Sequence, residues 1–261
     1  MNNQEIKIFQ IYYDPAQKTL LDPQFTPFYN AGGGVWHEYG VFKNQYESGK
    51  IQTLTGYLSW KFNFKTNLTG KTVINFIKAN PGYDVYFFNP FFELETLYKN
   101  VWEQGEVHHK GIIKMAESIY SSAGYDFRIS EEVHDVSKLL YCNYWVGTPQ
   151  FWEKYMSFLN KVEIVMSNST KEIASALNQK SGYHSNANYI PFILERSFST
   201  FIYNMKEVKA CAYKYSDYEK TEIIIKLRSS SEREFELQKN HSSQVKQNII
   251  KRAIGRFSLK K

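Results

Sequence analysis

The chain has 261 residues, two cysteines and a formal net charge of +6. This length permits one large domain or two small ones with a substantial core, so the fold does not require disulfides. No segment approaches the roughly 18 consecutive apolar residues of a membrane-spanning helix, and the polar first residues do not resemble a secretory signal. We therefore expect a cytosolic protein in which Cys142 and Cys211 are small core residues.

The positive charge is concentrated at the C-terminal end. After Glu236 there are seven basic residues and no acidic residue, which leaves a net charge of −1 for residues 1–236. Residues 1–236 are thus nearly neutral and lack the basic stripe of a nucleic-acid-binding protein, so we expect no nucleic-acid partner. The aromatic content of 17% suits stacking on sugar rings, although an AT-rich genome would also raise Tyr and Phe.

The first elements in chain order are two strands separated by a long connection. Residues 5–13 alternate polar and apolar side chains before an Asp-Pro stop, which predicts a strand. Residues 14–50 contain several prolines and a glycine run with neither period, which predicts an irregular loop of the kind that often carries function. Residues 56–64 predict the second strand.

The run of residues 80–91 is the most informative stretch. A Pro-Gly pair ends the helix predicted for residues 69–79, an apolar strand follows at Val85–Phe88, and Asn89 begins the stop. Asp84 lies at the mouth of this buried strand, where a carboxylate is costly to desolvate unless it has a donor, a cation or a metal as partner. The alternative is that Asp84 only caps its own turn.

The order of strand, loop, strand, helix and strand favours an α/β sheet, with residues 1–228 as one domain. A Thr-Pro pair gives an N-cap signal for the helix after residue 148. The remaining expected helices cover residues 110–123, 149–162 and 191–203, and the remaining expected strands cover residues 141–146, 208–215 and 222–227.

Residues 229–261 have a separate character. From Val245 to Phe257 the apolar residues fall on one helical face with basic residues around it, which predicts a basic amphipathic helix. Such a helix fits attachment to an anionic membrane surface. Docking on its own domain or on a partner protein is the alternative.

Several catalytic signatures are absent from the sequence. It has no phosphate-binding Gly-x-x-x-x-Gly-Lys loop, no dinucleotide fingerprint after a strand, no Gly-x-Ser-x-Gly elbow and no His-Glu-x-x-His motif. We therefore do not expect nucleoside triphosphate hydrolysis or flavin or nicotinamide redox chemistry.

Three groups of polar residues remain as site candidates. The cluster at residues 100–109, expected on a loop, includes Glu103 as a possible general base and a histidine pair that either meets a metal or phosphate or is simply solvated. Lys61, beside Trp60, offers the positive charge that a diphosphate needs. Glu195 and the following arginine lie in an otherwise apolar helix, where they either point into a cleft or form a surface ion pair.

Taken in order, several segments resemble bacterial glycosyltransferases encoded among capsule and lipopolysaccharide assembly genes. These segments span most of residues 8–199 and are Ile8–Tyr13, Gly56–Phe62, Asp84–Pro90, Trp102–Gly105 with His108-His109, Tyr141–Val146 leading into Phe151-Trp152, and Glu195–Ser199. The resemblance implies a GT-A-like, Rossmann-type mixed α/β sheet flanked by helices, here followed by the C-terminal basic amphipathic helix.

In enzymes of this kind, a short acidic motif holds the diphosphate of the donor through a divalent metal. The resemblance therefore implies Mn²⁺ or Mg²⁺ at Asp84. The second carboxylate of the motif would stand at position 86, which is Tyr86 here. Either Asp84 binds the metal with help from other residues, or cations such as Lys61, Lys65 and Arg196 replace the metal; a metal-independent mechanism is equally open.

The resemblance implies a cytoplasmic glycosyltransferase, peripheral at the inner face of the cytoplasmic membrane, that moves a sugar from a nucleotide-sugar donor to a glycan or lipid-linked acceptor. The alternative is a non-catalytic carbohydrate-binding or assembly subunit that binds no nucleotide. The expected site residues are Glu103 or Glu195 as catalytic carboxylate, Asp84, Asn89, Lys61, His108, His109 and Arg196 at the donor, and Trp60, Tyr144 and Trp145 as stacking aromatics.

Overall fold

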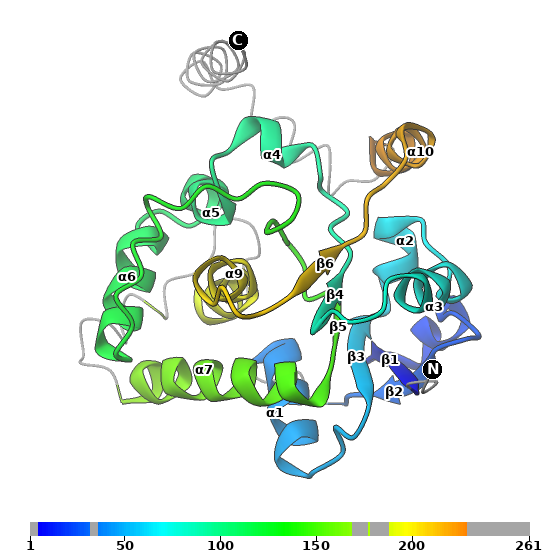
Figure 1. Cartoon of the computed structure of the whole chain (residues 1–261), viewed down its shortest axis with the longest axis horizontal. Coiled ribbons are helices and arrows are strands. Elements are labelled where there is room, and N and C mark those ends of the chain that lie inside the picture. Colours follow the sequence, from blue (N-terminus) through cyan, green and yellow to red (C-terminus); the bar gives the residue numbers. More distant parts are fainter. Residues whose placement is uncertain (1–4, 32–35, 169–176, 178–187, 229–261) are drawn as a thin grey trace.

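The computed structural model describes residues 5–31, 36–168, 177 and 188–228. Within them, a six-stranded mixed sheet with the order β2-β1-β3-β5-β4-β6 is flanked by helices (Figure 1). The strands are β1 (Ile6–Tyr12), β2 (Thr26–Tyr29), β3 (Leu54–Ser59), β4 (Val85–Phe87), β5 (Trp145–Gly147) and β6 (Ala210–Ala212). The predicted α/β class is confirmed, whereas the predicted tail at 229–261 lies outside the described residues.

One reversed strand determines which loops share an edge of the sheet. β1 pairs in parallel with β2 and β3, and β4 pairs in parallel with β6. β5 runs antiparallel to both of its neighbours, β3 and β4. The segment that precedes β5 therefore reaches the same edge as the segments that follow the other strands.

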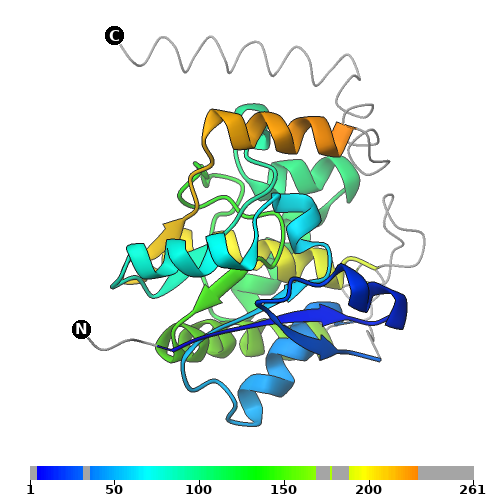
Figure 2. The same ribbon diagram turned by 90° about the vertical axis from the view of Figure 1, so that its right-hand side faces the viewer.

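Helices cover both faces of the sheet (Figure 1). One face carries α1 (His37–Glu47), α7 (Pro149–Ser167) and α9 (Ile190–Asn204), with α5 (Val101–His108) and α6 (Ile112–Ser122) farther out. The other face carries α2 (Phe62–Thr66) and α3 (Gly70–Ala79). The remaining elements are η1 (Pro15–Leu20), α4 (Leu94–Leu97) and α10 (Asp217–Arg228). In Figure 2, α10 lies at the top of the described part of the chain and α1 at the bottom, with the sheet between them.

Aromatic side chains form much of the core on both faces. On the α1 face, Trp145 packs against Trp152 with ring centroids 4.5 Å apart, and against Phe42 and Phe198. On the α3 face, Phe76 packs edge-on against Tyr86 and Phe88. Edge-to-face packing of this kind contributes beyond the burial of apolar area, so the aromatic content of the chain serves mainly the core.

The strongest local signals in the sequence are confirmed. The strand at the N-terminus and the short strand β4 form where the apolar patterns predict them. The hydroxyl of Thr69 accepts from the backbone N–H of Thr72 at the start of α3, and that of Thr148 accepts from the N–H of Phe151 at the start of α7. Each cap satisfies a backbone donor that the helix cannot satisfy itself.

The prediction of an irregular loop over residues 14–50 is wrong, because this stretch contains η1, β2 and α1. β2 is a four-residue edge strand with Pro27 inside it, and an edge position tolerates the missing N–H. α1 begins without a side-chain N-cap and contains Gly40, so neither the usual start signal nor a clean apolar period is present.

Three other predictions also require correction. Residues 222–227 belong to α10, in which the buried Ile223 and Leu227 are spaced four apart on one helical face. The polar cluster at 100–109 lies mostly in helix α5, whose N-cap Asn100 accepts from the N–H groups of Trp102 and Glu103. The second strand ends at Ser59, and the chain turns directly into α2.

None of the described helices combines the length and the apolar character that a membrane crossing requires.

Candidate functional site

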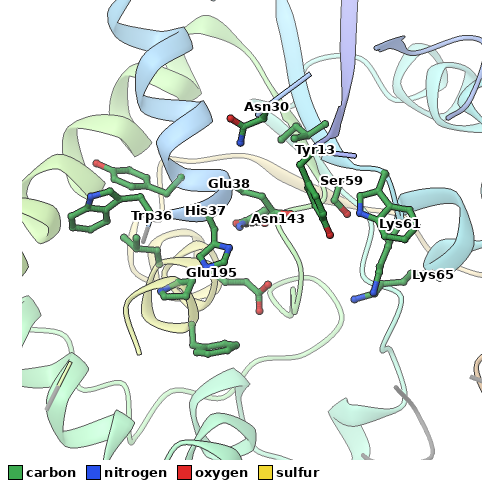
Figure 3. Close-up of a pocket in the computed structure, with 16 residues that line it drawn as sticks. Tyr13, Asn30, Trp36, His37, Glu38, Ser59, Lys61, Lys65, Asn143 and Glu195 are labelled. Atoms are coloured by element: carbon green, nitrogen blue, oxygen red, sulfur yellow. Dashed lines mark hydrogen bonds between the residues drawn. The ribbon is translucent and has the colours of Figure 1, made fainter. Parts of the chain in front are cut away.

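A cavity of about 460 Å³ opens at the edge of the sheet where β1, β2 and β3 end (Figure 3). Its walls come from the residues after these strands, from the first turn of α1, from α2, from Asn143 before β5 and from the first turns of α9. Open α/β sheets bind ligands outside the carboxyl ends of their strands, and a cavity of this size suits a small molecule.

One wall of the cavity carries two lysines and a pair of aromatic rings. Lys61 and Lys65 line this wall, and the Nζ atom of Lys61 lies 5.3 Å from the centroid of the Trp60 ring. The Tyr13 ring, 57% exposed, meets Trp60 edge-on with centroids 6.4 Å apart. The wall therefore offers positive charge for an anionic group and flat surfaces for a ring.

A buried polar network holds α2, and with it Lys65, against the sheet. The fully buried Gln10 of β1 donates from Nε2 to Oδ1 of Asn63 at 2.9 Å, and its Oε1 accepts from the N–H of Asp22 at 2.7 Å. Asn63 in turn donates to Oδ2 of Asp22 at 3.0 Å. Since each partner satisfies the next, the network fixes the start of α2 relative to the end of β1.

Glu195 contributes a carboxylate to the same cavity as the two lysines. It lies in α9 and is partly exposed, and its carboxylate points into the cavity (Figure 3). Burial raises the pKa of Glu195 to about 7, with a further increase from the charge of Glu38, while the charges of Arg196 and Lys65 oppose the shift. A carboxyl group with a pKa near neutrality is suited to take up and release a proton.

The first turn of α1 brings His37 and Glu38 to the cavity. The Glu38 carboxylate accepts from Nδ2 of Asn143 at 3.0 Å. α1 is fixed against α7 because Glu163 accepts from the Tyr39 hydroxyl at 2.7 Å and from Nζ of Lys43 at 2.8 Å. These contacts join α1, α7 and the segment before β5 around one site.

The structure brings four of the residues expected at the site together in the cavity wall: Trp60, Lys61, Lys65 and Glu195. Tyr144 is buried directly behind the wall, where its hydroxyl lies 3.0 Å from Oγ of the cavity residue Ser59. Burial raises the pKa of the Tyr144 hydroxyl well above its ordinary value, which keeps this group neutral and able to donate.

The structure places Asp84 and Asn89 outside this cavity. Asp84 lies at the amino end of β4, on the sheet edge opposite the cavity, and its Oδ2 accepts from the N–H of Lys209 at 2.8 Å. Asn89 follows β4 and uses Oδ1 to accept from the N–H of Phe91 at 3.2 Å, as in an Asx turn. Both side chains thus accept a backbone hydrogen bond away from the cavity, Asp84 from a distant segment and Asn89 from its own turn.

Glu103, His108 and His109, in and just after α5, do not line the cavity. Glu103 accepts from the backbone N–H of Lys99 at 2.6 Å near the start of the helix. His108 and His109 are buried, and the His109 ring stacks on Phe192 with centroids 4.0 Å apart. Phe192 lines the cavity, so His109 supports the wall from behind.

Arg196 connects α9 to α5. Its guanidinium is buried and donates to the backbone oxygen of Val101 at 3.0 Å and to Oε1 of Gln104 at 2.6 Å. Gly105 makes this approach possible, because a Cβ atom there would lie 2.6 Å from Nε of Arg196. Trp145, expected to stack on a sugar, is 1% exposed at the centre of the core.

Sequence reasoning missed Tyr13, His37, Glu38 and Asn143, all of which line the cavity. None of them belongs to a short motif, because they come from separate segments that meet only in the folded chain. The one useful signal is the expectation that residues 14–50 carry function, since this stretch contributes the first turn of α1 to the cavity.

The residues implied as metal ligands do not form a metal site at the cavity. Asp84 lies at the other edge of the sheet, and the hydroxyl of Tyr86 donates to the backbone oxygen of Asn80 at 2.6 Å. Across the part of the chain that the structure describes, no group of three or more His, Cys, Asp or Glu side chains is arranged to hold a metal ion.

The fold and the site define an α/β protein with a ligand-sized cavity at the carboxyl edge of its sheet, lined by lysines, aromatic rings and a carboxyl group with a raised pKa. Comparison of the chain with protein-family models, curated proteins and solved structures found no match.

Proposed function

We propose that the chain is a glycosyltransferase that moves a sugar from a nucleotide-sugar donor to a glycan or lipid-linked acceptor in the synthesis of a bacterial surface polysaccharide. The observation that carries the proposal is the position of Glu195, which faces the same cavity as Lys61 and Lys65 and has a pKa of about 7. The resemblance of the sequence segments to bacterial glycosyltransferases supports the substrate class.

The charges of the cavity suit the two chemical demands of sugar transfer, which are deprotonation of the acceptor hydroxyl and departure of the nucleoside diphosphate. Glu195 takes the proton of an acceptor hydroxyl, whose oxygen attacks the anomeric carbon of the donor sugar. The bond between that carbon and the phosphate oxygen breaks, and the nucleoside diphosphate leaves with the electron pair. Lys61 and Lys65 offset the negative charge that develops on the departing diphosphate.

The aromatic residues provide surfaces for rings. Trp60 and Tyr13 stand at the lysine wall, while Trp36 and Phe192 contribute apolar surface elsewhere in the cavity. Flat apolar faces with polar rims suit a sugar or a nucleobase. The donor is thus held by charge at its diphosphate and by contact with these faces at its rings.

The proposal is tested by measuring the melting temperature of the full-length protein with each of a panel of sugar nucleotides, in the presence and absence of Mn²⁺. We expect one donor to raise the melting temperature and to release nucleoside diphosphate when an acceptor glycan is added. Glu195→Gln should keep the donor-induced shift and lose the release of nucleoside diphosphate. A panel in which no sugar nucleotide binds contradicts the proposal, and binding of glycans alone favours a carbohydrate-binding subunit.

We also propose that the enzyme works at the inner face of the cytoplasmic membrane and is held there by residues 229–261. The support is the sequence pattern of this tail, with apolar residues on one helical face and lysines and arginines around it. Sedimentation of the full-length protein with anionic and with neutral vesicles tests this. Replacement of Lys246, Lys251, Arg252 and Arg256 by Gln should abolish binding to the anionic vesicles; unchanged binding contradicts the attachment.

A further inference from the structure

Two carboxylates from distant parts of the chain line the same cavity. Glu38 comes from the first turn of α1, and Glu195 comes from α9 (Figure 3). The Glu38 carboxylate is hydrogen-bonded to the side chain of Asn143, which is 9% exposed and lies just before β5. The two acids therefore have different surroundings, which is the arrangement in which they perform different tasks.

The position of Glu38 is enforced from several sides. α1 is tied to α7 by the contacts of Tyr39 and Lys43 with Glu163. His37, directly before Glu38, has a φ of 46°, a left-handed conformation that is uncommon for a residue other than glycine. A conformation of this kind persists where the surrounding structure determines it, and such residues cluster at functional sites.

We propose that Asn143 and Glu38 are positioning residues for Glu195: the Asn143 amide holds the Glu38 carboxylate at the cavity, and the negative charge of Glu38 makes Glu195 a stronger base. The proposal deepens the proposed function and rests on it for the role of Glu195 as base. The proton that Glu195 takes from the acceptor hydroxyl passes to solvent after the product leaves.

The charges around Glu195 act in opposite directions. Burial and the charge of Glu38 raise the pKa of Glu195, whereas the charges of Arg196 and Lys65 lower it. The effect of Glu38 on the pKa of Glu195 is thus opposite to that of Arg196 and Lys65. The titratable and charged groups around Glu195 are His37, Glu38 and Tyr39 from α1, Tyr155 from α7, Lys65 from α2, Arg196 from α9, and Tyr13 and Lys61 on the cavity wall.

The direct test is the titration of Glu195 in the full-length protein by NMR of ¹³C-labelled glutamate carboxyl groups, with the signal assigned by its loss in Glu195→Gln. We expect the wild-type midpoint near 7 and a lower midpoint in Glu38→Gln, which stays above 4.5 because the burial of Glu195 is unchanged. Glu47→Gln is the matched control, because it removes the same charge from the exposed end of α1. The control should leave the midpoint unchanged.

A double-mutant cycle separates positioning from a merely structural effect of Asn143. Asn143→Leu should lower the midpoint in the wild-type background and have no further effect in the Glu38→Gln background. If Asn143→Leu does not fold, Asn143→Ala takes its place in the cycle. Equal shifts in both backgrounds show that Asn143 does not act through Glu38 and overturn its assigned role.

The titration needs no substrate, so its result is independent of the glycosyltransferase assignment. A Glu195 midpoint that is the same in Glu38→Gln as in the wild type overturns the inference even if the protein transfers sugar. Conversely, a lowered midpoint in a protein that binds no sugar nucleotide upholds the coupling of the two carboxylates and contradicts only the proposed function.

Discussion

Glu195 and Arg196 are consecutive residues of α9, but only Glu195 lines the cavity, whereas the guanidinium of Arg196 is bonded to Val101 and Gln104 of α5. Consecutive helical residues point about 100° apart, so a charged pair adjacent in sequence need not form an ion pair. The Glu195 carboxylate therefore faces the cavity, whereas Arg196 stabilises the contact between α9 and α5.

The first prediction concerns the pH dependence of stability at Glu195. Its pKa in the folded protein, about 7, lies above the ordinary value of 4.5, so the folded state holds the proton more tightly than the unfolded state. The stabilisation is fully present below pH 4.5 and is lost as the pH rises through 7. The free energy of unfolding of the wild type should therefore fall relative to that of Glu195→Gln by up to about 3 kcal/mol over this range.

Urea denaturation of both proteins at a series of pH values measures this difference. A difference that does not change with pH would show that Glu195 titrates normally in the folded protein. It would remove the main support for Glu195 as the base.

The second prediction concerns Lys65. Lys65→Gln should weaken the binding of a nucleoside diphosphate by roughly tenfold or more at low salt, because it removes one of the two cations of the cavity wall. The loss should diminish as salt is added, since ions screen the attraction between the lysine and the diphosphate. Calorimetric titration at two salt concentrations provides the measurement.

Lys71→Gln is the matched control for Lys65→Gln. Lys71 is exposed in α3 and does not line the cavity, so the control changes the net charge equally but should leave the affinity unchanged. Equal losses in the two variants would indicate a general effect of protein charge and not a site.

The third prediction concerns Arg196, which the sequence suggested as a donor-binding residue. Arg196→Met should lower the free energy of unfolding by about 2–4 kcal/mol, because it leaves buried acceptors in α5 without their charged donor. Arg128→Met, at an exposed ion pair with Glu131, should cost less than about 1 kcal/mol. If Arg196→Met keeps full stability and loses donor binding, the residue belongs to the site.

The fourth prediction concerns Asp84. Asp84→Ala should cost about 1 kcal/mol of stability through loss of the hydrogen bond from Lys209, and should leave the affinity for a sugar nucleotide unchanged with or without Mn²⁺. Thermal unfolding and donor titration of the same variant measure the two effects. If Asp84→Ala loses the part of the sugar-nucleotide affinity that depends on Mn²⁺, Asp84 is a metal ligand and the prediction is wrong.

The sequence predicted those elements whose signal is local. α3 and α7 follow threonine caps and carry apolar residues at helical spacing, and β4 is a short apolar run between turn residues. β2 and α1 were missed because an exposed four-residue strand and an uncapped helix are stabilised by their neighbours and not by local preference. In α10, the β-branched isoleucines misled the prediction.

The sequence by itself determined the α/β class and indicated Trp60, Lys61 and Glu195 as site candidates. The charges of Lys61 and Glu195 interrupt apolar patterns and are visible without a structure, and Trp60 is the aromatic residue beside Lys61. Only the tertiary structure decided which candidates meet. The antiparallel direction of β5 brings Asn143 to the edge where β1, β2 and β3 end, and the same strand order places Asp84 at the opposite edge. Strand direction depends on pairing between distant segments, and no local run of residues encodes it.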